Sequence, residues 1–334
     1  MNKVISAIFF AYSFVPLYAG GLNTPRPLPG NPTPPQVEVS NRPTPMYLAD
    51  KLAYLTAHVR SKLGQSPVTG TGFFFDFCVQ LCKDGRLRRV PTLVTNKHVV
   101  LGYTSTTIRF TVMENGRPSD KFIDYTLTSE DANQWIPHPD NYVDLCALPI
   151  APIIRKLEAE GTKVFTMPLT TSMVADEKYL ESVTQLDDVV MIGYPDGLWD
   201  EVNNQPIFRK GVFATRPNKN YNGHREFVID MPVYNGSSGS PVLIANDQIR
   251  FDRSTRSAVL PSGHVKLVGI VYKTFLHNQN GKIVPVQIPT VLQQQDAAAI
   301  IPVPTMQIPN NLGLVISASR MLELEDLISK TFPN

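Results

Sequence analysis

A turn rich in glycine and serine, residues 235–241, constrains the fold of this chain more than any other stretch. It joins two short apolar runs, 227–231 and 242–244, in which valine and isoleucine favour extended backbone. Gly236 and Gly239 allow the chain to reverse within a few residues, because glycine tolerates positive φ. The stretch therefore predicts two β-strands joined by a tight turn. Turns of this composition are common, so the turn alone specifies no chemistry.

Short apolar runs separated by turn signals continue through most of the chain. They are residues 73–77, 92–95, 107–112, 122–128, 188–193, 208–214 and 226–230. Such runs predict an all-β fold, and Asn115 followed by Gly116 predicts a hairpin turn. Residues 47–63 and 319–330 instead carry apolar side chains at helical spacing and predict helices. His58 falls in the first of these helices and is expected to lie on its surface.

Three side chains from separate stretches form a candidate set for nucleophilic chemistry. Ser238 lies in the turn, His98 follows an apolar run, and Asp144 begins another. A serine hydroxyl is a weak nucleophile that needs a base, and an imidazole can serve as that base near neutral pH. A carboxylate can orient the imidazole. His138 and Asp140 are weaker candidates for these roles, because neighbouring prolines indicate a loop.

The stretches around these residues resemble the trypsin and chymotrypsin superfamily of serine peptidases, in its bacterial type. LVTNKHVV ends at residue 100, YVDLCAL surrounds Asp144, and GSSGSP surrounds Ser238. They are similar to the three motifs of that family, in its order of His, Asp and Ser. TGTGFFF at 69–75 and LVGIV at 267–271 are similar to two of its strands.

The resemblance implies a fold of two six-stranded antiparallel β-barrels, with an N-terminal helix and a C-terminal helix. The first barrel is expected over about residues 66–150 and the second over about residues 162–334. Together they would form one trypsin-like peptidase domain over residues 47–334.

The resemblance also implies a role for each candidate residue. His98 would be the general base, Asp144 would orient it, and Ser238 would form an acyl-enzyme in a serine endopeptidase. The backbone N–H groups of Gly236 and Ser238 would form the oxyanion hole. The expected partner is a peptide or protein substrate, and no cofactor and no metal are expected.

Substrate preference is less constrained by the sequence. Alignment with the family places Tyr272, Lys273 and Thr274 on the substrate-binding wall. Lys273 either favours acidic substrates or points to solvent. Pro232 stands where a preference for Arg or Lys needs a carboxylate, so that preference is not expected. Ser237 replaces the Asp that pairs with a newly cut N-terminus in trypsins, so no zymogen switch of that type is expected.

Two alternatives remain at the level of sequence. The chain is either a catalyst or a non-catalytic binding module on the same fold, because a fold does not guarantee its usual activity. A binding module has no need of the complete His, Asp and Ser set. An esterase that uses the same three residues is the other alternative.

The N-terminal residues predict export. Residues 1–19 have a lysine near the start, an apolar run and a small residue before a predicted cut after Ala19, as signal peptides do. Residues 20–46 are rich in proline and are expected to form an extended linker. The mature protein is therefore expected to be secreted or periplasmic, with no membrane insertion after signal cleavage.

Composition excludes some partners. The net charge of +2 gives no electrostatic reason to expect nucleic acid binding.

Three cysteines are an odd number, so at least one is unpaired within the chain. Cys146 is expected to be a buried free thiol, while Cys78 and Cys82 could close a small loop. Cysteine and histidine do not occur at metal-ligand spacing.

Overall fold

The computed structural model describes residues 47–332, apart from 65, 83–84, 86, 246–249, 253–256, 260–264 and 281–304. The predicted signal peptide and the proline-rich linker lie outside the described residues. Strands make up most of the secondary structure in the described part, which confirms the prediction of a mainly β fold. No helix there has the length and apolar character that a membrane span requires.

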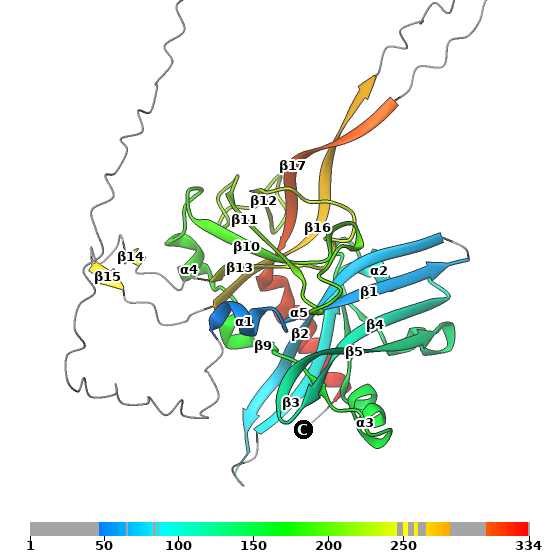
Figure 1. Cartoon of the computed structure of the whole chain (residues 1–334). Coiled ribbons are helices and arrows are strands. Elements are labelled where there is room, and N and C mark those ends of the chain that lie inside the picture. The colour runs from blue at the N-terminus through cyan, green and yellow to red at the C-terminus, as the bar shows by residue number, and fades with distance from the viewer. Residues whose placement is uncertain are drawn as a thin grey trace, which may run out of the picture. The chain divides into compact units, whose positions relative to one another are not determined.

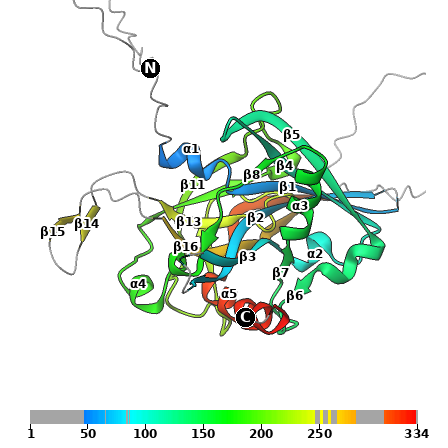
Figure 2. The same cartoon turned by 90° about the horizontal axis from the view of Figure 1, so that it is seen from below.

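Nine strands form the first sheet, in the order β5-β4-β1-β2-β3-β7-β6, with β8 paired to β4 and β9 to β2 (Figures 1 and 2). They are β1 (Thr56–Leu63), β2 (Ser66–Leu81), β3 (Leu87–Thr95), β4 (Ser105–Glu114), β5 (Arg117–Thr128), β6 (Ile136–Pro137), β7 (Cys146–Pro149), β8 (Val164–Phe165) and β9 (Leu169–Thr170). Asn115 and Gly116 join β4 to β5 with φ of 51° and 75°. They form the predicted two-residue hairpin turn.

Six strands close into a barrel, in the order β10-β11-β12-β17-β16-β13. They are β10 (Asp188–Gly193), β11 (Ile207–Phe213), β12 (Glu226–Asp230), β13 (Pro241–Ala245), β16 (Val265–Asn280) and β17 (Thr305–Ser317). A separate two-stranded sheet pairs β14 (Arg250–Asp252) with β15 (Ser257–Val259). The closed barrel agrees with the second of the two expected barrels. The first is seen as the nine-stranded sheet, and its closure into a barrel stays a prediction.

The helices are short. They are α1 (Leu48–Leu52), α2 (Lys97–Val100), α3 (Ala151–Ala159), α4 (Glu177–Glu181) and α5 (Met321–Thr331), with 3-10 turns η1 (Ser129–Gln134), η2 (Thr171–Met173), η3 (Pro195–Gly197) and η4 (Ala318–Arg320). The C-terminal helix predicted over 319–330 corresponds to η4 and α5, which is red in Figure 2.

The prediction of an N-terminal helix over residues 47–63 is wrong for most of that range. Only α1 is helical, and Thr56–Leu63 forms β1, which pairs with both β2 and β4. His58 is therefore a strand residue with 2% of its surface exposed, and not a surface histidine. Both faces of β1 are buried over its first residues. The alternation that would have identified a strand is therefore absent.

The strand β2 links two buried clusters because its side chains alternate between its two faces. Phe73, Phe75 and Phe77 belong to a cluster shared with barrel strands and α5. Phe74 lies in the cluster formed by the first sheet and α3. Each fully buried phenyl group contributes about 1.5–3 kcal/mol to folding. This packing fixes β2 against the barrel, including β13, the strand that follows the Gly/Ser turn.

The cysteines are not disulfide-bonded. Cys78, Cys82 and Cys146 are free thiols, so the possible loop between the first two is not closed by a covalent bond. Cys146 is fully buried, as predicted, and burial raises the pKa of its thiol to about 12. The thiol is therefore protonated at neutral pH and is a poor nucleophile.

Candidate active site

The position of His98 follows from the end of β3. The strand stops at Thr95, Asn96 begins the single turn of α2, and His98 lies on that turn with 47% of its side chain exposed. Asn96 is buried and its side-chain amide donates to the backbone oxygen of Asp144 at 2.6 Å. The start of α2 is thereby fixed to the loop that carries Asp144.

Asp144 reaches His98 because of the pairing between β3 and β7. Thr95 pairs with Cys146, so the residue two positions before Cys146 lies beside α2. One oxygen of the Asp144 carboxylate accepts the backbone N–H of His98 at 3.1 Å, and the other contacts the ring nitrogen Nδ1. Two contacts to one residue fix both the position and the rotation of the imidazole. With Nδ1 facing the carboxylate, Nε2 is the nitrogen left to accept a proton.

The turn that carries Ser238 is held by β2. The backbone N–H of Thr71 donates to the oxygen of Ser238 at 2.8 Å, and its hydroxyl donates to the oxygen of Gly236 at 2.9 Å. On the other side, the N–H of Gly239 donates to the oxygen of Val271 in β16 at 2.8 Å. The motif around Thr71 thus anchors the turn from the first sheet.

Contacts at Gly239 place this turn beside the end of β3. A β-carbon on Gly239 would lie 2.6 Å from the hydroxyl of Thr95, three residues before His98. The half-buried Ser238 therefore sits next to the segment that presents the imidazole. Ser238 and His98 are not hydrogen-bonded to each other. Such bonds are often long in free enzymes and shorten when substrate binds.

Two backbone N–H groups of the turn are left without an acceptor. Within the described part of the chain, the N–H groups of Ser237, Gly239 and Ser240 each have a backbone acceptor, whereas those of Gly236 and Ser238 have none. Gly236 adopts a φ of +84°, a backbone conformation that glycine tolerates without strain. Two free donors beside a serine hydroxyl are what an oxyanion hole requires.

Alanine at position 236 is expected to lower kcat roughly 10²–10³-fold, the effect of losing one oxyanion donor. A β-carbon there would clash with the backbone oxygen of Tyr194, so the turn must shift. Gly223→Ala is the matched control, since Gly223 has the same φ of +84° with nothing within 4 Å. It should cost about 1–2 kcal/mol of stability and leave kcat unchanged. Equal kcat in the two variants would contradict this prediction.

The predicted substrate-binding residues lie on β16, beside the turn. Tyr272 is half-buried at a β-bulge. Burial, and to a smaller extent the Glu226 carboxylate, raises the pKa of its phenol. The hydroxyl of Thr274 donates to the oxygen of Leu312 at 3.2 Å. Lys273 is exposed, which agrees with a side chain that points to solvent.

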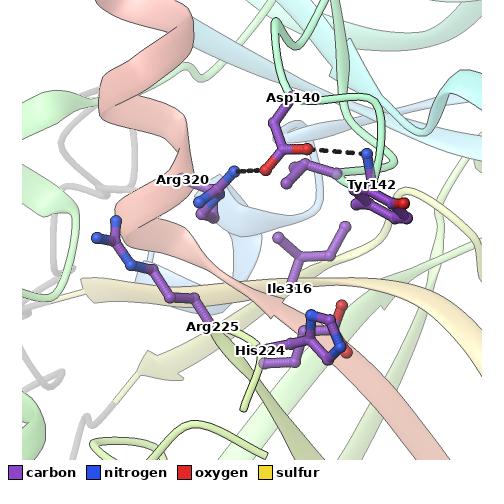
Figure 3. Close-up of a pocket in the computed structure, with 8 residues that line it drawn as sticks. Asp140, Tyr142, His224, Arg225, Ile316 and Arg320 are labelled. Carbon is purple, nitrogen blue, oxygen red and sulfur yellow. Dashed lines mark hydrogen bonds and ion pairs between the residues drawn. The ribbon is translucent and has the colours of Figure 1, made fainter.

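A cavity adjoins the loop that precedes Asp144 (Figure 3). Asp140 lines it and accepts from Arg320 at 2.7 Å and from the N–H of Tyr142 at 2.9 Å. The hydrogen bond from Tyr142, aided by the Arg320 guanidinium, lowers the pKa of Asp140. The Asp140 carboxylate forms no hydrogen bond or ion pair with His98, so Asp144 is the better candidate partner of the imidazole. Sequence reasoning did not identify Arg320, which joins this loop to the C-terminal helix.

His58 is a second residue near the turn whose place at the site the sequence analysis did not identify. Its ring stacks on Tyr194 with centroids 4.7 Å apart, and its Nε2 lies 2.7 Å from the hydroxyl of Thr69. Burial, with a smaller effect from Arg60 and Arg109, lowers the pKa of His58 from 6.5 to about 4. The imidazole is therefore neutral at physiological pH.

The low pKa of His58 predicts a loss of stability in mild acid. In the unfolded chain the imidazole binds a proton near pH 6.5, whereas the folded protein binds it only near pH 4. The unfolded state is therefore favoured progressively as the pH falls through this window, by up to about 3 kcal/mol. Urea unfolding of the wild type and of His58→Gln between pH 7 and pH 4 measures the effect. The variant should lack this part of the pH dependence, and the exposed His224→Gln should retain it. Parallel curves for His58→Gln and the wild type would contradict the assignment.

Within the described residues, no group of three or more His, Cys, Asp or Glu side chains is arranged to hold a metal ion. His98, Asp144 and Ser238 are the residue types that a serine peptidase uses. The sequence model of the trypsin-like peptidase domain matches residues 70–249, more than half of the chain. The chain therefore belongs to the trypsin-like peptidase domain family, and the protein is a serine endopeptidase that acts on peptides or proteins.

Several solved structures are similar at low identity. They include Rv3671c protease of M. tuberculosis H37Rv in its inactive form, with 16% identity, 82% of this chain and 89% of that chain covered, and a TM-score of 0.37. The serine endoprotease from Yersinia pestis has 15% identity, with 86% and 68% covered and a TM-score of 0.43. HtrA-type protease AlgW with tripeptide has 14% identity, with 84% and 62% covered and a TM-score of 0.40. These scores are below 0.5, so the assignment rests on the family match. No curated protein sequence matches significantly.

Proposed function

We propose that the protein is an exported serine endopeptidase that cleaves peptide bonds through an acyl-enzyme formed on Ser238. The observation that carries this proposal is the pair of contacts from the Asp144 carboxylate to the ring and the backbone of His98. We also infer that the nine-stranded sheet is the first barrel of the expected two-barrel fold.

In the proposed first half-reaction, Nε2 of His98 accepts the Ser238 proton as the hydroxyl attacks the substrate carbonyl. Asp144 stabilises the imidazolium that forms and keeps the ring in position. The negative charge on the carbonyl oxygen is stabilised by the N–H groups of Gly236 and Ser238. Collapse of the tetrahedral intermediate breaks the C–N bond, and His98 returns the proton to the leaving amine.

In the second half-reaction, water replaces the amine. His98 accepts a proton from the water, which attacks the acyl carbonyl while the same two N–H groups stabilise the oxygen again. The bond to Ser238 then breaks, and its hydroxyl recovers the proton. The substrate would lie along β16, beside Tyr272, Lys273 and Thr274.

Incubation of the purified protein with a peptide library, followed by mass spectrometry of the products, tests this function. Cleavage at internal peptide bonds that is lost in His98→Gln is expected. Matched peptide and ester substrates separate a peptidase from an esterase. Hydrolysis of esters alone, or no hydrolysis that depends on His98, would contradict the proposal.

Export is tested by the mass of the mature protein. Expression of the full chain in a bacterium with an intact secretion pathway should yield a periplasmic or secreted protein that begins at Gly20. The expected mass difference corresponds to loss of residues 1–19. A protein that keeps Met1 and remains in the cytoplasm would contradict export without affecting the proposed chemistry.

A further inference from the structure

We propose that His58 is a positioning residue for the oxyanion hole, which it supports through Thr69 and Tyr194. This inference rests on the proposed function, because it concerns the same Gly236 and Ser238 N–H groups. His58 does not touch the reacting atoms. Its role would be to hold the backbone on which the placement of Gly236 depends.

The first step is the fit of the ring of His58. It lies nearly parallel to the ring of Tyr194, with an interplanar angle of 9°. The indole of Trp199 packs against the same imidazole, with ring centroids 5.0 Å apart. The Nε2 atom is hydrogen-bonded to Thr69 at 2.7 Å. A side chain with 2% exposure and these contacts has a fixed position.

The second step is that both partners of His58 reach Gly236. A β-carbon on Gly236 would lie 3.0 Å from the methyl carbon Cγ2 of Thr69, and it would clash with the backbone oxygen of Tyr194. The free N–H of Gly236 therefore belongs to a peptide that is packed directly on these two residues.

The third step is the contact between the two backbone segments. The N–H of Asp196 donates to the oxygen of Asn235, so the segment after β10 is bound to the residue just before Gly236. Gly197 also faces His58, since a β-carbon on Gly197 would lie 4.0 Å from the Nε2 atom of His58. His58 thus packs against Thr69 and against residues 194–197, the two parts of the chain that contact Gly236. A shift of that peptide would move a donor away from the developing oxyanion.

Three variants separate the contacts. Thr69→Val removes the hydroxyl and keeps a methyl group toward Gly236, and Thr69→Ser does the reverse. His58→Phe keeps an aromatic ring against Tyr194 and removes the hydrogen bond. Ser61→Ala is the matched control, because Ser61 is fully buried on the same strand and its hydroxyl lies 2.9 Å from that of Thr106, outside these contacts.

The readouts are kcat and KM for a cleaved peptide, together with the affinity for a peptide boronate that mimics the tetrahedral intermediate. In His58→Phe and Thr69→Val we expect kcat and boronate affinity to fall together by about 10- to 100-fold, with KM almost unchanged. Ser61→Ala should match the wild type in all three. Unchanged kcat in folded His58→Phe and Thr69→Val, or an equal loss in Ser61→Ala, would overturn the proposal.

A measurement that does not need turnover separates this inference from the proposed function. Hydrogen exchange of the amides in 235–240 should be faster in His58→Phe than in the wild type or Ser61→Ala. If the wild type shows no hydrolysis dependent on Ser238, the proposed function fails, and the exchange result still decides whether His58 holds the turn. Equal exchange in all three proteins would count against the positioning role.

Discussion

Alanine in place of Ser238 is expected to abolish peptide hydrolysis, with kcat lower by roughly 10⁶-fold, as when the nucleophile of a comparable triad is removed. The hydroxyl has no hydrogen-bond partner in the described part of the chain, so its loss should leave folding stability nearly unchanged. The turn remains anchored through backbone contacts to Thr71 and Val271. Initial rates with a cleaved peptide, and thermal unfolding of both proteins, measure the two effects.

Ser237→Ala is the matched control for this prediction. Ser237 is the neighbouring serine, is fully buried, and accepts the N–H of Tyr234 at 3.4 Å. Its variant should keep most of the activity and lose some stability. Hydrolysis that survives Ser238→Ala but not Ser237→Ala would show that Ser238 is not the nucleophile.

Asparagine in place of Asp144 is expected to lower kcat roughly 10⁴-fold, with the fold retained. The amide has the shape of the carboxylate but one oxygen instead of two. It cannot accept both the backbone N–H and the ring N–H of His98. The imidazole would therefore favour the wrong tautomer, with Nε2 protonated and unable to accept the serine proton. The dependence of kcat on pH, measured for wild type and variant, tests this effect.

Asp140→Asn provides the comparison, because Asp140 lies on the same loop and its carboxylate contacts Arg320 and not His98. Its substitution should weaken the attachment of the loop to the C-terminal helix and change kcat by only a few-fold, because the partly buried ion pair with Arg320 does not include His98. Similar losses of kcat in the two variants would indicate that Asp144 acts through loop structure alone.

Much of the site follows from local sequence. His98, Asp144 and Ser238 each lie within a few residues of a strand end, and the apolar runs that define those ends are short and clear. Thr95 and Cys146 illustrate what sequence lacks: their pairing brings Asp144 to His98, and it depends on strand register between distant segments. Register is set by packing across the sheet, so no local pattern contains it.

The features that the sequence predictions got wrong or missed also depend on contacts between distant segments or on very short strands. The spacing of Leu48, Leu52, Leu55 and Val59 fits a helix, but β-sheet pairing on both sides of Thr56–Leu63 outweighs that local preference. The strands β8 and β9 have two residues each, which is too short for any periodicity to be visible. The role of His58 depends on Tyr194 and Thr69, which only the fold brings together.

The central claim is that His98 and Asp144 activate the hydroxyl of Ser238. Labelling with a fluorophosphonate, followed by peptide mapping, measures this activation directly. The account predicts one adduct, on Ser238, that is absent in Ser238→Ala and forms far more slowly in His98→Gln and Asp144→Asn. No adduct on the folded wild type, or an adduct on another serine that forms at the same rate in all variants, would contradict it.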